Sequence, residues 1–187
     1  MAGGTAVQTG TTWRLDPTHS SVEFSVKHMM MTTVRGRFKN VTATLTADEE
    51  HPEGCCVEVE IDAASIDTGV ADRDAHLRGP DFFDAEQYPK ITFKSDGAEG
   101  DFGKEGDKFR VNGQLTIRDT TMPLTLDCTF EGRGKDPWGK ERAGFTAKGE
   151  IDRREWGLRW NQAIETGGVL VANKVRIEAE VQFVKHG

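Results

Sequence analysis

Long apolar runs and cysteine pairs are what this sequence most clearly lacks. No uninterrupted apolar stretch reaches the roughly eighteen residues that a membrane-spanning helix requires. There are only three cysteines, and two of them, Cys55 and Cys56, are adjacent and would point to opposite faces of a strand. A chain of 187 residues can bury a sufficient core without disulfides. We therefore expect a soluble domain in a reducing compartment, the cytoplasm.

The residue patterns of common enzyme sites are also missing. The chain contains no HExxH or CxxC zinc pattern, no GxSxG nucleophile turn, no P-loop and no GxGxxG dinucleotide signature. Its five histidines are spread along the sequence: His19, His28, His51, His76 and His186. We therefore expect no metal, no cofactor and no catalytic residues.

The charge pattern excludes a further class of partner. The formal net charge is −7, and the basic residues are scattered among acids along the sequence. Proteins that bind nucleic acid usually carry a concentrated Lys/Arg patch. We therefore expect neither nucleic-acid binding, nor binding to an anionic membrane surface, nor membrane insertion. Residues 1–12 lack the basic start and apolar core of a signal peptide, and we interpret them as a disordered tail.

Alternation of apolar and polar residues is the dominant pattern over the rest of the chain, residues 13–187. In one such row Val22, Phe24 and Val26 alternate with polar neighbours, which is typical of a strand with one face in solvent. About eight rows of this kind, joined by Gly-rich loops, predict an all-β domain with one antiparallel sheet. A barrel or a sandwich could bury the apolar face, and we favour the barrel because closure leaves no exposed edge.

One segment interrupts this alternation and predicts a short helical insert at about residues 71–87. Thr68 could cap a helix over 71–78, and Gly79 followed by Pro80 would end it. The segment also carries a cluster of large apolar and aromatic residues that the helix alone cannot bury: Leu77, Phe82, Phe83 and Tyr88. We expect this cluster to pack on the sheet, as a lid or a plug at one end of the barrel.

Several positions on the apolar rows are small, and they allow two interpretations. They could leave a cavity for an apolar guest, or the glycines could mark bends where strands coil. These positions are Gly36, Ala43, Gly113, Ala147, Gly149 and Ala179.

A set of ordered motifs resembles a known family. The motifs are Asp16-x-x-His19-Ser20-x-Val22-x-Phe24-x-Val26-x-His28, Arg73-Asp74-x-His76-Leu77-Arg78-x-x-Asp81-Phe82-Phe83-Asp84, Tyr88-Pro89-x-Ile91-x-Phe93, Gly113-x-Leu115-Thr116-Ile117-Arg118 and Ile151-x-Arg153-x-x-Trp156-Gly157. Together they resemble the YceI-like, polyisoprenoid-binding family between about Trp13 and Val184. The resemblance implies a lipocalin-like barrel that holds a long isoprenoid or another amphiphilic lipid, often as a homodimer, with no chemical step established.

We therefore expect a carrier or sequestering protein for a polyprenyl or quinone-like lipid. The alternative is an enzyme that acts on a lipid held in the same barrel. Three local questions stay open. Arg73 and His76 could form a structural network or contact a ligand head group, and Met29 to Met31 could form a gate or a dimer contact. Trp138, Trp156 and Trp160 could be core or rim aromatics, which we favour, or could stack on a cofactor. The expected ligand-binding residues are Phe24, Val26, His28, Met30, Phe38, Arg73, His76, Leu77, Phe82, Phe83, Phe93, Phe109, Val111, Gly113, Leu115, Phe145, Trp156 and Trp160.

Overall fold

The computed structural model describes residues 10–48, 55–162 and 170–186. In this part of the chain strands dominate, with one α-helix and three short 3-10 turns. The strands are β1 (Thr11–Leu15), β2 (Ser21–His28), β3 (Thr32–Phe38), β4 (Val41–Ala47), β5 (Cys56–Asp62), β6 (Ile66–Asp67), β7 (Lys90–Gly100), β8 (Lys108–Ile117), β9 (Thr120–Lys135), β10 (Glu141–Asp152) and β11 (Val171–His186). The helix is α1 (Ala71–Arg78), and the 3-10 turns are η1 (Pro17–His19), η3 (Ala63–Ser65) and η4 (Arg153–Trp156).

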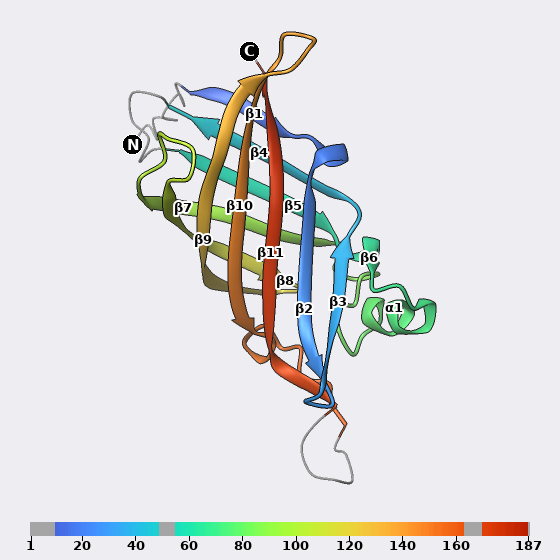
Figure 1. Ribbon diagram of the computed structural model, residues 1–187. Coiled ribbons are helices and arrows are strands. Elements are labelled where there is room, and N and C mark those ends of the chain that lie inside the picture. The colour runs from blue at the N-terminus through green and yellow to red at the C-terminus, as the bar shows by residue number, and fades with distance from the viewer. Residues whose placement is uncertain (1–9, 49–54, 163–169, 187) are drawn as a thin grey trace, which may run out of the picture.

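The sheet closes on itself through β1. This strand pairs with β4 on one side and with β11 on the other, which completes an antiparallel ring in the order β1-β4-β5-β7-β8-β9-β10-β11 (Figure 1). The predicted all-β barrel of about eight strands is therefore confirmed. Closure also satisfies the edge groups that an open sheet would leave exposed.

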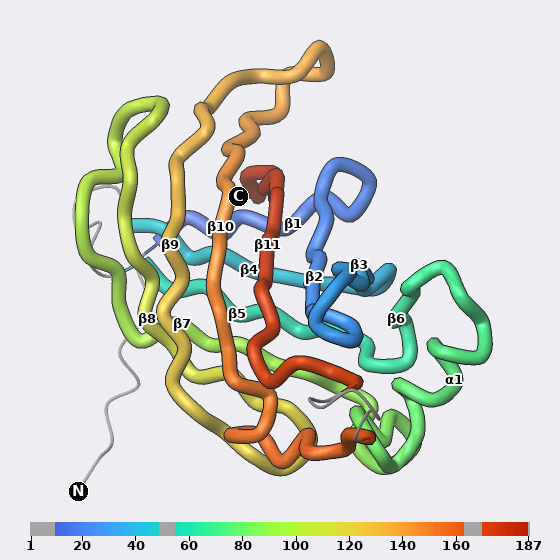
Figure 2. The backbone as a smooth tube through the Cα atoms, turned by 60° about the horizontal axis from the view of Figure 1, so that its bottom comes forward, coloured from blue at the N-terminus to red at the C-terminus, as the bar shows by residue number. Residues whose placement is uncertain are grey.

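The long strand β11 pairs with two different strands along its length. Phe183 and its neighbours pair with β1, whereas the stretch from Val171 to Glu180 pairs with β2. The turn η1 separates β1 from β2, so that β2, β3 and β6 extend the sheet beyond the ring. Figure 2 shows this extension next to α1, and the two together border one end of the barrel.

The interior contains two clusters of buried residues. The cluster around Trp13, Ala43, Ala143 and Phe183 fills the end of the barrel near β1. The larger cluster continues toward α1 and includes Phe93, Trp156 and Leu158 as well as several aliphatic residues. The apolar space between the second cluster and the α1 segment, by which we mean residues 68–87, is therefore the candidate region for a site.

The helical insert is present, with two differences from the expectation. α1 ends at Gly79, directly before Pro80, as predicted, but residues 79–87 form turns rather than more helix. Thr68 does not cap the helix, because Val70 is the N-cap residue and makes no side-chain bond. Instead the buried carboxylate of Asp74 accepts hydrogen bonds from the backbone N–H and the hydroxyl of Thr68.

The barrel begins slightly earlier than expected. Thr11 and Thr12 belong to β1 and pair with β4, although they were assigned to the tail. The remainder of the expected tail, residues 1–9, lies outside the described residues. Within the described part, no helix has the length and apolar character needed to cross a membrane.

Candidate functional site

The barrel contains an apolar cavity with a volume of about 340 Å³. Strands β2, β3, β5 and β7 to β11 form its wall, and residues of the α1 segment cover one side. Val22, Ile61, Leu124 and Ile177 illustrate the aliphatic character of this wall. The volume falls in the range of roughly 300–1,000 Å³ that is typical of small-molecule sites.

The small residues on the apolar rows serve two different purposes. Ala147 on β10 and Ala179 on β11 are directly paired and lie side by side, and both line the cavity. Gly113 does not line it, because the ring of Phe93 lies over this glycine. Gly36 is covered in the same way by Phe24. Thus the alanines leave space for a guest, whereas these glycines leave space for a neighbouring phenyl ring.

Most of the expected ligand-binding residues meet on the cavity wall, although they come from seven separate segments. Twelve of the eighteen line it: Phe24, Val26, His28, Phe38, Arg73, His76, Leu77, Phe82, Phe83, Phe93, Leu115 and Trp160. The structure brings them together because β2 and β3 lie next to the α1 segment at one end of the barrel (Figure 2), with the ring centroids of Phe38 and Phe83 5.8 Å apart.

The other six lie elsewhere. Phe109 and Phe145 stack edge to face, with centroids 6.1 Å apart, in an aromatic group beyond the cavity. Trp156 is only 2% exposed, and its indole N–H donates to the Leu115 carbonyl at 2.9 Å, so it is a core residue. Val111 packs against the main core. Gly113 is covered by Phe93, and Met30 is 69% exposed.

The side of the cavity next to α1 carries its aromatic and polar groups. The ring of His76 packs edge-on against Phe82 and Trp160, with centroids 5.1 and 4.7 Å apart, and its Nε2 lies 2.9 Å from an Asp81 carboxylate oxygen. Arg73 donates from Nε to the Thr68 hydroxyl at 2.8 Å. Both side chains thus form local networks. Both also line the cavity, where they are within reach of a ligand head group.

Arg153 is a wall residue that was not among the expected ones. The residue is 4% exposed, and its guanidinium donates to the carbonyls of Leu158, Ala172 and Val171 at 2.6, 2.9 and 3.3 Å. No carboxylate of the described residues forms an ion pair with it, and burial lowers its pKa from the usual value. The Ile151-x-Arg153 motif could have indicated this residue. An arginine directly after an apolar strand is easily buried, and a buried guanidinium needs hydrogen-bond acceptors within the protein.

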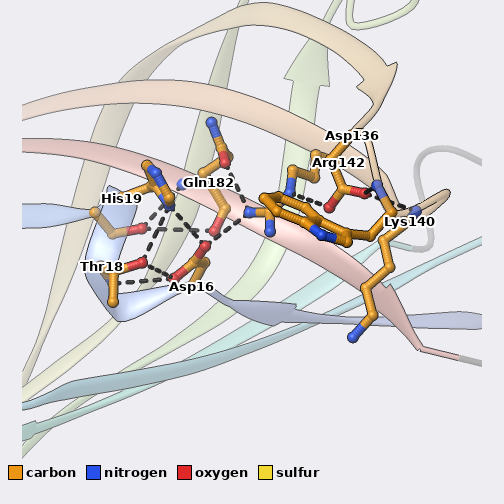
Figure 3. A network of polar contacts seen from close by, with 9 residues as sticks. Asp16, Thr18, His19, Asp136, Lys140, Arg142 and Gln182 are labelled. Atoms are coloured by element: carbon orange, nitrogen blue, oxygen red, sulfur yellow. Dashed lines mark hydrogen bonds and ion pairs between the residues drawn. The ribbon is translucent and has the colours of Figure 1, made fainter.

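A separate polar network lies at the hairpin between β9 and β10 (Figure 3). Arg142 donates to Asp16 at 2.7 Å and to Asp136 at 2.8 Å, and His19 Nδ1 lies 2.8 Å from the same Asp16 carboxylate. Hydrogen bonds from Arg142, Thr18 and His19 hold the pKa of Asp16 far below its usual value. The network borders a second, polar groove of about 380 Å³ that shares no lining residue with the cavity.

The described residues offer no cluster of ligands for a metal ion. In residues 10–48, 55–162 and 170–186, no three His, Cys, Asp or Glu side chains are grouped so that they could hold one ion. Within the same ranges, Thr68 is the only hydroxyl residue on the cavity wall, and its hydroxyl already bonds to Asp74 and Arg73.

Comparison with known proteins gives consistent results. A UPF0312 protein of Staphylococcus epidermidis is 37% identical over 174 residues, which are 92% of this chain and 97% of that protein. The crystal structure of Burkholderia cenocepacia BcnA superposes with a TM-score of 0.76 at 26% identity, covering 90% of this chain and 98% of BcnA. A polyisoprenoid binding domain from Saccharophagus degradans has the same fold, with a TM-score of 0.67 at 14% identity over 93% of this chain and 98% of that domain.

One family model, which describes the YceI-like domain, matches residues 13–183, and this range contains all the strands of the barrel from Trp13 to Phe183. The protein therefore belongs to the YceI-like domain family.

Proposed function

We propose that this protein binds a long-chain isoprenoid or a similar amphiphilic lipid, polyprenyl or quinone-like, in the lumen of its barrel. It carries or sequesters the lipid and performs no chemical step on it. The observation that carries the proposal is the apolar cavity of about 340 Å³, which is open beside the paired small residues Ala147 and Ala179 although the surrounding core is packed.

The shape and chemistry of the cavity support a lipid rather than a polar metabolite. Its wall is almost entirely aliphatic and aromatic, and desolvating a polar ligand there without hydrogen-bond partners would cost several kcal/mol. An apolar chain gains about 25 cal/mol for each Å² that it removes from water. The name of the Saccharophagus degradans domain, a polyisoprenoid binding domain, supports an isoprenoid as the first ligand to test.

An enzyme acting on the same lipid is the alternative. Acid–base or nucleophilic catalysis requires titratable groups within hydrogen-bond reach of the substrate. Glu23, at the exposed rim, is the one carboxylate among the described wall residues, and no cysteine lies on the described wall. Two histidines, His28 and His76, line it, but Nε2 of His76 already contacts Asp81 at 2.9 Å. These features favour a carrier. We likewise propose that the protein works without a metal or cofactor, that it acts in the cytoplasm, and that it can form a homodimer.

The cavity proposal can be tested by filling the lumen. In Ala179→Phe a phenyl ring would project from β11 into the lumen, and we expect the purified variant to lose the lipid that the wild-type protein carries. Organic extraction followed by mass spectrometry measures the bound lipid. Glu178→Phe is the matched control, since the same ring on the neighbouring, 63% exposed position points away from the lumen and leaves binding intact.

Two results would overturn the proposal. One is a wild-type protein that is empty after purification and takes up no added long-chain isoprenoid. The other is an Ala179→Phe variant that folds and binds lipid as the wild type does. Recovery of a chemically altered lipid after incubation would instead establish the enzyme alternative.

A further inference from the structure

The turn between β2 and β3 places apolar side chains in solvent. Met30 and Met31 are 69% and 70% exposed, and they are two of the four large exposed apolar residues in the described ranges. The turn forms the tip of the β2–β3 hairpin, which extends to one end of the molecule (Figure 1). We call residues Met29 to Met31 the methionine tip.

The backbone of this tip adopts a conformation that methionine does not favour. Met29 and Met30 have φ values of +51° and +59°, and the N–H of Met31 donates to the His28 carbonyl at 3.1 Å. Two consecutive positive φ values favour Asn-Gly in a hairpin turn, and a non-glycine residue there costs about 1 kcal/mol or more. The sequence thus retains apolar side chains at the expense of hairpin stability, which suggests that the exposed methionines have a role.

Positive charge surrounds the tip, although the whole protein is acidic. The stretch 24–47 contains four Lys or Arg residues and no Asp or Glu. Lys27 and Arg35, the two nearest the tip, form no ion pair with any described residue. On the neighbouring strand Lys174 and Arg176 share a single carboxylate, Glu150, at 3.5 and 3.8 Å.

These charges gather only in the folded protein. The register pairs Ser25 with Arg176 on one side and with Arg35 on the other, so that residues far apart in the sequence form one basic surface. Because the basic residues are scattered along the sequence, we expected no binding to an anionic membrane surface. The basic surface forms only when the strands pair, so the sequence alone does not reveal it.

The tip is also continuous with the cavity. His28, directly before the tip, lines the cavity, and the N–H of Met29 donates to the carbonyl of another wall residue, Leu170, at 2.8 Å. A lipid that leaves the cavity beside β2 would therefore emerge next to the methionines.

We propose that the methionine tip, together with the basic surface of Lys27, Arg35, Lys174 and Arg176, docks on a lipid bilayer with anionic head groups. The methionines enter the head-group region, and the basic side chains contact the anionic lipids. Apolar residues combined with Lys and Arg are the features that bind proteins to such interfaces. This inference rests on the proposed function, because docking gives an apolar ligand a path between bilayer and cavity that avoids bulk water.

The sharpest variant is Met29→Asn combined with Met30→Gly. These residues suit positive φ values, so the variant should melt at the same temperature as the wild type or higher, while its binding to phosphatidylglycerol-containing vesicles in co-sedimentation falls at least tenfold. Trp138→Ser is the matched control, because Trp138 is 81% exposed at the hairpin near the polar network, and its loss should leave vesicle binding unchanged.

A second pair of variants tests the charges. Lys27→Gln with Arg35→Gln should weaken vesicle binding by about fivefold for each charge removed, and vesicles of pure phosphatidylcholine should bind weakly to every variant. Lys94→Gln with Arg110→Gln changes the net charge equally on other strands and should have little effect. High salt should abolish the difference, since charges at an exposed surface are screened.

Three outcomes would overturn the inference: wild-type protein that stays in the supernatant, tip variants that bind as the wild type does, or binding lost through Trp138→Ser instead. A tip variant that turns a dimer into a monomer in ultracentrifugation, without affecting vesicle binding, would assign the tip to a second copy of this chain.

Solution binding of farnesol, followed by the intrinsic tryptophan fluorescence, to which Trp160 on the cavity wall contributes, separates this inference from the proposed function. Farnesol binding that survives in the tip variants together with lost vesicle binding supports docking. If the wild-type protein binds neither farnesol nor longer isoprenoids, the proposed function is contradicted. The vesicle experiment then still decides whether the methionine tip docks on a bilayer.

Discussion

The phenyl ring of Phe93 on β7 lies against the α-carbon of Gly113 on β8. A β-carbon at Gly113 would come within 2.4 Å of Phe93 Cζ and within 2.6 Å of the Lys94 carbonyl oxygen. Contacts this short cannot exist, so this glycine is required by its neighbours, at the place where a β-bulge after Ser95 shifts the register between β7 and β8. The ring that it accommodates is itself part of the cavity wall.

We expect Gly113→Ala to lower the free energy of unfolding by about 1–3 kcal/mol, the usual cost of overpacking a filled site. Urea denaturation measures this loss through a lower midpoint at unchanged slope. Gly134→Ala is the control, because a β-carbon there meets nothing within 4 Å, and its effect should be close to zero. Phe93→Leu should restore part of the stability of Gly113→Ala, and a fully additive double variant would count against the contact.

Arg153 should not tolerate replacement by lysine. Its planar fork reaches the carbonyls of Leu158, Ala172 and Val171 at once, whereas an ammonium group cannot match that geometry. We expect Arg153→Lys to cost about 2–4 kcal/mol in urea denaturation because buried carbonyls lose charged donors. Arg154→Lys is the adjacent control, since Arg154 is half exposed and pairs only with Asp152; equal effects of the two changes would contradict this account.

Asp16 should make stability depend on pH. Hydrogen bonds from Arg142, Thr18 and His19 lower its pKa from the ordinary 3.8, so the folded state binds its proton more weakly than the unfolded state. The stabilisation is therefore complete above about pH 4 and is lost as the pH falls below that value. Asn can still cap η1, so Asp16→Asn isolates the charge and should cost about 1–3 kcal/mol at pH 7 and progressively less as the pH falls from 4 to 2.

The control for this pH dependence is Asp127→Asn. Asp127 is 77% exposed and lies 3.3 Å from Arg110, and an exposed pair of this kind contributes little. Thermal melts of both variants and the wild type between pH 2 and pH 7 give the comparison. A constant difference between Asp16→Asn and the wild type across this range would show that the charge is not responsible.

Cys128 should be inert toward alkylating reagents in the folded protein. Burial, with a smaller effect of Asp127, raises the pKa of its thiol to about 12, and the reactive thiolate is then roughly one part in ten thousand at pH 8. In a variant with Cys55→Ser and Cys56→Ser, iodoacetamide should label Cys128 only after unfolding in guanidinium. Rapid labelling of the native variant, detected by mass spectrometry, would be inconsistent with this burial.

Local features of the molecule were predictable from the sequence. The alternating rows predicted the strands, including the row from Phe109 to Ile117 that forms β8, because side chains on a strand alternate between two faces. Gly79 followed by Pro80 predicted the end of α1, because neither residue continues a helix. Ten of the twelve expected residues that meet at the cavity, all except Phe38 and Trp160, lie in the family motifs.

The depth of each residue along the barrel was decided only by the tertiary structure. Alternation places Phe93 and Phe145 on the same inner face, yet Phe93 lines the cavity and Phe145 lies in the aromatic group that fills the other end. The distinction depends on strand register and on closure through β1, which are set by contacts between residues far apart in the sequence. The same long-range register places Phe93 over Gly113 and joins Arg35 with Arg176 in one basic surface, because pairing between strands, and not the order of residues within a strand, determines which side chains meet.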